Sequence, residues 1–85
     1  LAHLLRELEY LTELDPKQQW SKDVVSLFRQ AIHERNTRPN DIIDKRTWLD
    51  KLDELLRVNL LHLRANFERL RKGLAKCRDY IFNFL

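Results

Sequence analysis

The sequence has no methionine, one glycine, two prolines and one cysteine among its 85 residues. So few helix-breaking residues leave long stretches of the chain free to form helix. The single cysteine, Cys77, excludes an internal disulfide. No apolar run approaches the roughly 18 residues of a membrane span, and the first residues lack the pattern of a signal peptide. We therefore expect no membrane contact and a cytoplasmic location, and the missing methionine leads us to expect a fragment of a longer protein.

The length and composition indicate one small helical domain. Of the residues, 44% are hydrophobic and 34% are charged. At this size, folding removes only about 60–65% of the surface of the unfolded chain from water, so the stability margin is thin. We expect a partner, or the rest of a parent chain, to contribute to stability.

Charge is distributed unevenly along the chain, although the net charge is only +3. Residues 1–56 carry nine Lys or Arg and eleven Asp or Glu, whereas residues 57–78 carry seven and one. The second region alone therefore has a charge of +6. A strongly basic helical region is typical of nucleic-acid contact, and it is also compatible with a solvated helix surface.

The hydrophobic periodicity predicts an all-α fold with helices near residues 1–14, 16–35 and 41–85. The first helix has leucines at one-face spacing and ends before the segment DPKQ at 15–18. There Asp15 is a candidate cap, and Pro16 fits the first turn of the next helix. A loop, NTRPN at 36–40, follows the second helix. We expect a helical hairpin packed on one long C-terminal helix.

The long C-terminal helix is predicted by a heptad that passes through Gly73 without losing phase. Its positions are Ile42, Leu49, Leu56, Leu63, Leu70, Cys77 and Phe84, interleaved by Leu60, Phe67, Leu74 and Ile81. Such a helix is about 67 Å long, whereas the second helix covers only about 30 Å of it. The uncovered far half would expose an apolar stripe, so self-association, most simply as a homodimer, is expected.

The residue types that carry metal or nucleophile chemistry are sparse. The three histidines, His3, His33 and His62, have no pair at the four-residue spacing that places two ligands on one helical face. Cys77 lies at a heptad core position, where a thiol acts as a small hydrophobe. We expect no metal, no cofactor, no small-molecule substrate and no catalytic residue in this chain.

Four arginines, Arg57, Arg64, Arg71 and Arg78, are each seven residues apart. On a continuous helix they form one ridge beside the apolar seam, with about 10 Å between neighbours. One interpretation is the flank of a coiled coil, which meets acidic partners or keeps the seam in solution. The other is a ridge that follows the phosphates of a nucleic acid.

Three segments of the chain resemble insertion-sequence transposases of the sixty-six family. LAHLLRELEYL resembles the family's C-x-A-H-h-x-R-E-L segment, QQW at 18–20 continues the match, and RLRKGLAKCRDYIFNFL resembles its basic stretch ending in D-x-h-x-x-F-L. The residues that fit the first segment are Leu1, Ala2, His3, Arg6, Glu7 and Leu8. Residues 36–66 match mainly in helical character.

These transposases are bacterial enzymes with a ribonuclease-H-like core and an Asp-Asp-Glu catalytic triad. The resemblance implies that this chain is the helical insert between the second and third catalytic acids, and that it is not catalytic by itself. A Pro-x-Asp-Asn-Asn-x-x-Glu-Arg signature with the third acid is expected after the chain. The resemblance also implies Mg²⁺ in the parent enzyme and transposon-end DNA as its partner.

The resemblance places His3 near the active-site side of the core, with Arg6 one helical turn later. Two roles stay open for His3. One is contact with DNA or shaping of the active site, and the other is a hydrogen bond to a neighbouring carbonyl where the insert docks on the core. Two functional classes also stay open. One is a part of a DNA transposase that braces the core and contacts DNA, and the other is a self-associating helical module without a nucleic-acid role.

Overall fold

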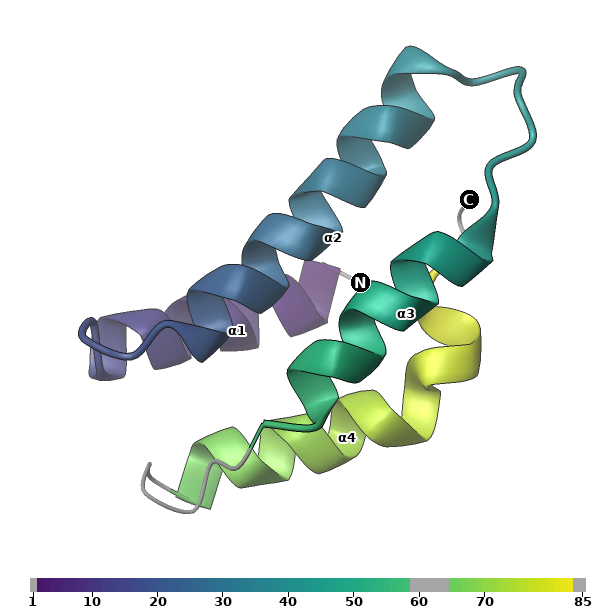
Figure 1. Cartoon of the computed structure of the whole chain (residues 1–85). Helices are drawn as coiled ribbons and strands as arrows, with labels where there is room; N and C mark the ends of the chain where they lie inside the picture. The colour runs from purple at the N-terminus through teal and green to yellow at the C-terminus, as the bar shows by residue number, and fades with distance from the viewer. Residues whose placement is uncertain (1, 59–64, 84–85) are drawn as a thin grey trace.

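The chain folds into two helical hairpins that pack against each other (Figure 1). A computed structural model describes residues 2–58 and 65–83. The all-α fold predicted from the sequence is confirmed for these residues. The helices that they form are α1 (Ala2–Leu14), α2 (Trp20–Thr37), α3 (Lys45–Leu56) and α4 (Ala65–Ile81).

The first hairpin pairs α1 with α2 in antiparallel orientation. The hydroxyls of Thr12 and Ser21 are 2.6 Å apart near the turn, and Arg29 forms an ion pair with Glu9 farther along. Leu8 of α1 is fully buried in the core. The hairpin predicted from the sequence is therefore present.

The turn of this hairpin differs from the prediction, because α2 begins at Trp20 and not at Pro16. The side-chain oxygen of Gln18 accepts a hydrogen bond from the backbone N–H of Ser21, at 3.0 Å. Gln18 thus satisfies a free donor at this helix start, the role that the sequence had suggested for Asp15. The helix also extends two residues past its predicted end, to Thr37.

The third helix begins at Lys45, four residues after the predicted start. The carboxylate of Asp44 caps it by accepting a hydrogen bond from the backbone N–H of Arg46, at 2.9 Å. Before this cap, Ile42 is 98% exposed and Ile43 is buried. The placement of Ile42 in the heptad core was therefore wrong.

The single helix predicted over 41–85 is corrected to two helices, because α3 ends at Leu56. Trp20 Nε1 donates a hydrogen bond to the carbonyl of Leu55, at 2.9 Å, and Arg71 Nη1 donates to the carbonyl of Leu56, also at 2.9 Å. The last carbonyls of a helix need partners other than its own N–H groups. Side chains from α2 and α4 supply them here, so this helix end is built into the core.

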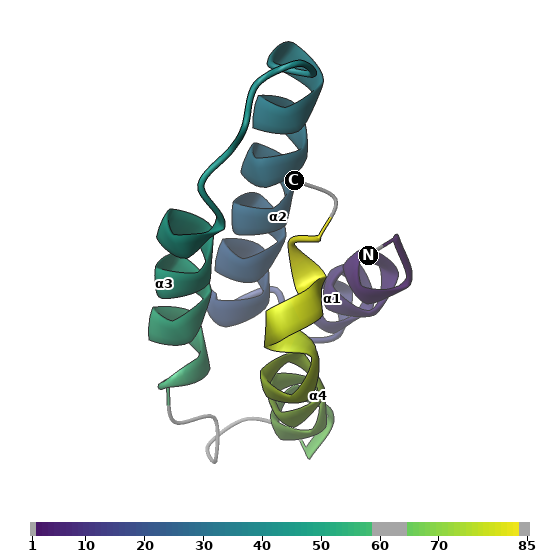
Figure 2. The same cartoon turned by 90° about the vertical axis from the view of Figure 1, so that its right-hand side faces the viewer.

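The fourth helix runs back along α3 and passes beside α1 (Figure 2). Trp48 near the start of α3 lies 6.3 Å from Phe82 beyond the end of α4, measured between ring centroids. At the opposite end of the core, Trp20 and Phe67 meet edge to face at 6.5 Å. Phe82 also lies 5.8 Å from Phe28 of α2 between ring centroids, so aromatic contacts tie both ends of the second hairpin to the first.

This arrangement covers the apolar stripe that had suggested a dimer. Within the described residues, Phe67, Leu70, Leu74 and Ile81 are all buried by the chain itself. The stripe was predicted correctly, but its partner is the same chain. The predicted homodimer is not tested by these contacts, but the apolar stripe no longer argues for it, because the chain itself covers the described part. Leu1, Leu60, Leu63 and Phe84 lie outside the described residues.

Candidate nucleic-acid interface

The four arginines of the predicted ridge do not line one helix. Arg57 follows α3 as an exposed residue, whereas Arg71 and Arg78 belong to α4. Arg64 lies outside the described residues. Because the predicted ridge required a continuous helix, it is corrected to separate groups with different environments.

Arg71 holds the two helices of the second hairpin together. Its Nε donates to the Glu68 carboxylate at 2.9 Å, its Nη2 donates to the other oxygen of that carboxylate, and its Nη1 reaches the Leu56 carbonyl. The hydrogen bonds and the charge of Glu68 raise the pKa of the Arg71 guanidinium, against the effect of burial. With its donors engaged inside the fold, Arg71 has a structural role.

Arg78 makes a second link between α4 and α3. Its Nε and Nη2 each donate to one oxygen of the Asp53 carboxylate, both at 2.8 Å, and its Nη1 donates to Asp79 at 2.9 Å. This two-point contact raises the pKa of Arg78, mainly through the hydrogen bonds that Arg78 donates to Asp53. Arg71 and Arg78, seven residues apart on α4, thus both bind α3 and hold the second hairpin together.

The polar residues of the LAHLLREL segment lie on the surface of α1. His3 is 85% exposed, and its Nε2 lies 3.4 Å from the carboxylate of Glu7. Arg6 is exposed and forms no ion pair with the residues that the structure describes. Leu8 of the same segment is fully buried. The segment therefore anchors α1 with its leucine and presents its histidine, arginine and glutamate outward.

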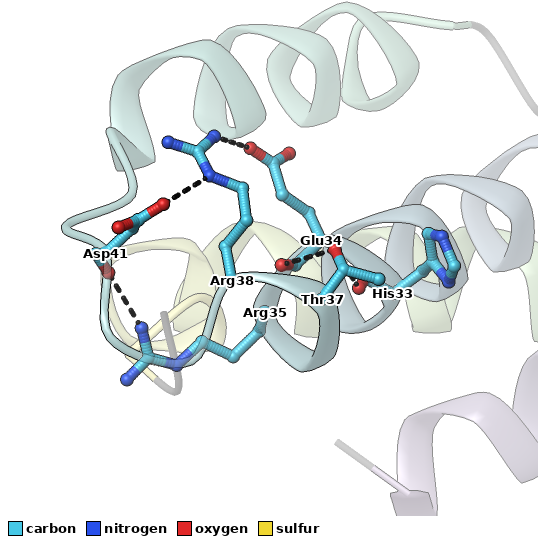
Figure 3. A network of polar contacts seen from close by, with 6 residues as sticks. All are labelled: His33, Glu34, Arg35, Thr37, Arg38 and Asp41. Carbon is cyan, nitrogen blue, oxygen red and sulfur yellow. Dashed lines mark hydrogen bonds and ion pairs between the residues drawn. The ribbon is translucent and has the colours of Figure 1, made fainter.

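Two further arginines hold the loop between α2 and α3 (Figure 3). The Arg38 guanidinium donates to Glu34 at 3.0 Å and to Asp41 at 2.9 Å, and Arg35 donates to the carbonyl of Asp41 at 3.1 Å. The hydrogen bond and charge of Asp41 raise the pKa of Arg38. Arg35 in the last turns of α2 and Arg38 in the loop are therefore both engaged in holding the shape of the loop.

The basic residues that the sequence reasoning missed are Arg69, Lys72 and Lys76 of α4. All three are exposed, and none forms an ion pair with a residue in the described part of the chain. Lys72 acts on Glu68 only through its charge, which helps to lower the pKa of that carboxyl. Spacings of three and four residues place the three cations along one side of a helix. This spacing, within the basic region 57–78, was the signal that could have found them.

A groove of about 330 Å³ lies beside this row of cations, between α1 and α4. Glu7 and Tyr10 of α1 line it from one side, and Asn66 and Arg69 of α4 line it from the other. Tyr10 remains 56% exposed. A larger surface hollow, of about 870 Å³, runs along α1 and α2 as far as Trp48. Cationic side chains from α2, including Arg29, share the wall of that hollow with acidic ones.

Neither a metal site nor a membrane-spanning helix is found in the described residues. Residues 2–58 and 65–83 contain no group of three or more His, Cys, Asp or Glu side chains placed to hold a metal ion. None of the helices described is both long enough and apolar enough to cross a bilayer. Comparison of the chain with protein-family models, curated proteins and solved structures finds no match.

Proposed function

We propose that this chain is a helical insert of a bacterial DNA transposase of the insertion-sequence sixty-six family. In this proposal it supports the catalytic core, contacts DNA and contributes no catalytic acid. The parent protein works in the cytoplasm, and its own catalytic acids hold Mg²⁺. The residues of this chain hold no metal in that scheme, since the ligands belong to the core.

The proposal is supported by the positions of the residues that resemble the transposase family: some are buried in the core, and others lie on the surface. Gln18 and Trp20 of the QQW segment are buried and fix the α2 start and the α3 end. His3, Arg6 and Glu7 of the first segment are exposed. Exposed polar residues are available for contacts with a partner, whereas the buried ones serve the fold. This division supports a docking role for the first turns of α1.

The alternative, a self-associating helical module without a nucleic-acid role, has lost its main argument. Its motivation was an uncovered stripe on a long helix, and Phe67, Leu70 and Leu74 of that stripe are buried within one chain. Three cations of α4 without ion pairs among the described residues favour contact with an anionic partner instead.

The coding sequence around the chain gives the most direct test. The proposal requires an Asp-Asn-Asn-x-x-Glu-Arg signature within about fifteen codons after Leu85 and a cysteine codon directly before Leu1. A reading frame that continues on both sides without these features would refute membership of the transposase family.

DNA contact by the chain is tested separately, by titration of a labelled duplex at two salt concentrations. Phosphate contacts release counterions, so the affinity should fall as salt rises, with a log–log slope of roughly −2 to −3 for two or three contacts. Affinity that does not change with salt would exclude phosphate contact as the basis of binding.

A further inference from the structure

The cations of α4 divide into an inner and an outer set. The inner set, Arg71 and Arg78, is tied to carboxylates of the fold. The outer row, defined as Arg69, Lys72 and Lys76, is exposed and has no such partner among the described residues. Its members follow one another by about 4.5 and 6 Å along the helix axis. The row is therefore a linear set of positive charges on one helix, without ion pairs to the described residues.

The groove between α1 and α4 adjoins this row and shares one member with it, Arg69. Its apolar part includes Leu70 and the exposed ring of Tyr10, and its polar part includes Glu7 and Asn66. A carboxylate accepts hydrogen bonds, and an amide both donates and accepts them. The groove thus combines an aromatic ring, polar groups of both kinds and a cation.

We propose that the groove and the outer row together bind a single-stranded segment of nucleic acid. One unpaired base lies in the groove against Tyr10, with its edge toward Glu7 and Asn66, and the flanking phosphates lie on Arg69, Lys72 and Lys76. This inference rests on the proposed DNA contact and adds the form of nucleic acid that this site recognises.

The chemistry of the surface favours a single strand over a duplex. Bases in a duplex are paired and stacked, so their faces are not available to an aromatic side chain. An unpaired base exposes both faces and its edge, and stacking on an aromatic ring tolerates any base. A row of cations without a base-sized groove would serve duplex and single strand alike. The position of the Tyr10 groove at one end of the row therefore decides the assignment.

Substitutions of Gly73 can fill the groove without changing its charge. It lies in α4 and lines the groove, and a Cβ atom added there meets nothing within 4 Å. Gly73→Ala should therefore keep the groove open, while Gly73→Leu extends a side chain into the space beside it. The two variants differ in bulk at one position without a change of charge.

The test measures fluorescence anisotropy of a labelled mixed-sequence 15-nucleotide DNA, as a single strand and as its duplex. Unlabelled polyphosphate serves as a competitor without bases. The expected result is single-strand binding about tenfold or more tighter than duplex binding. Tyr10→Ala should weaken single-strand binding about fivefold or more, which is the scale of one lost stacking contact. Duplex and polyphosphate binding should not change in this variant.

Two charge-matched variants test the phosphate row. Lys72→Gln with Lys76→Gln should weaken binding and make the log–log salt slope for the single strand shallower by about one unit or more. Lys17→Gln with Arg46→Gln removes the same charge from exposed positions outside the row and should change affinity by less than about twofold. Circular dichroism at 222 nm checks that each variant remains helical.

The outcomes separate this inference from the proposed function. Equal binding of single strand and duplex, or no effect of Tyr10→Ala or Gly73→Leu on single-strand binding, would overturn the groove assignment while DNA contact stands. Equal loss of affinity in both charge-matched variants would contradict the assignment of the phosphates to the outer row. No binding to either form of DNA would overturn the inference altogether, and the coding-sequence test would still decide whether the chain belongs to a transposase.

Discussion

Trp20 contacts the end of a helix that lies 35 residues away in sequence. Its ring contacts Phe67, and its indole N–H donates to the carbonyl of Leu55 in the last turn of α3. The ring of Trp20 is buried in the core. The polar contact of its ring could not be predicted, because it depends on how α3 meets α2.

We predict that Trp20→Phe lowers the free energy of unfolding by about 1 kcal/mol through the lost hydrogen bond, in addition to the smaller ring. Urea denaturation followed by circular dichroism measures the change. Trp48→Phe is the matched control, since it makes the same change of ring at a buried position that has no such hydrogen bond. An equal effect of the two substitutions would show that the contact with Leu55 contributes nothing.

The ion pair of Glu68 with Arg71 should stabilise the fold by an amount that depends on pH. Hydrogen bonds from Arg71 and the charges of Arg71 and Lys72 lower the pKa of Glu68, against a smaller opposing effect of burial. A carboxyl with a lowered pKa stabilises the fold above the pKa of the unfolded chain. This contribution disappears as the pH falls through the pKa of the folded state.

We therefore expect Glu68→Gln to be less stable than the parent chain near pH 6, with a difference that shrinks as the pH is lowered below the usual pKa of a glutamate side chain, about 4.3. Urea midpoints across this range give the comparison. Glu13→Gln, at an exposed site without an ion pair to the described residues, should show little difference at either pH. A Glu68→Gln difference that is constant with pH would contradict the role of the charged carboxylate.

At the scale of the helices, α4 continues smoothly through Gly73. No glycine of the described chain has a positive φ angle, so nothing in the backbone requires glycine at this position. Gly73 lies about midway along α4, where its flexibility in the unfolded chain opposes helix formation. The prediction of helix through Gly73 is confirmed. The sequence predicted no break anywhere in 41–85, but the helix ends at Leu56.

Gly73→Ala should raise the free energy of unfolding by about 1 kcal/mol, because alanine is the better helix former and its Cβ meets no neighbour. Gly73→Pro should have the opposite effect, since proline removes a backbone donor inside the helix. Thermal unfolding of the three proteins provides the measurement. A lower melting temperature for Gly73→Ala would mean that α4 is distorted at this residue.

At the scale of the whole molecule, the fold is short and self-covering. The Cα radius of gyration is 13.0 Å and the longest extent is 42 Å. A single helix over residues 41–85 would reach about 67 Å by itself. Because α4 folds back on α3, the molecule is shorter than one continuous helix would be, and Phe67, Leu70 and Leu74 are buried inside one chain.

Small-angle X-ray scattering should accordingly give a radius of gyration close to 13.0 Å, the Cα value of the folded monomer. The reason is that the described part of the apolar stripe needs no second chain to cover it. Light scattering at high micromolar concentration gives the mass independently. A dimer mass, or a maximum dimension above about 60 Å, would restore the long helix and the self-association first predicted from the heptad.

The sequence by itself determined the helical class, the first hairpin and the apolar face of α4. These features follow from local periodicity and the scarcity of Gly and Pro, which act within a few turns of helix. It also located the basic region. It could not separate Arg71 and Arg78 from Arg69, Lys72 and Lys76, because all five lie on one amphipathic helix.

Only the tertiary structure decided where the long heptad is interrupted and which cations remain free. A heptad stripe fits an antiparallel partner within the chain as well as a second chain, so its spacing does not fix helix continuity. The decision came from contacts between distant residues: Trp20 with Leu55, Arg71 with Leu56, and Arg78 with Asp53. Because those contacts engage Arg71 and Arg78 and leave the outer row to solvent, the folding of α4 onto α3 also sets which surface is available to a nucleic acid.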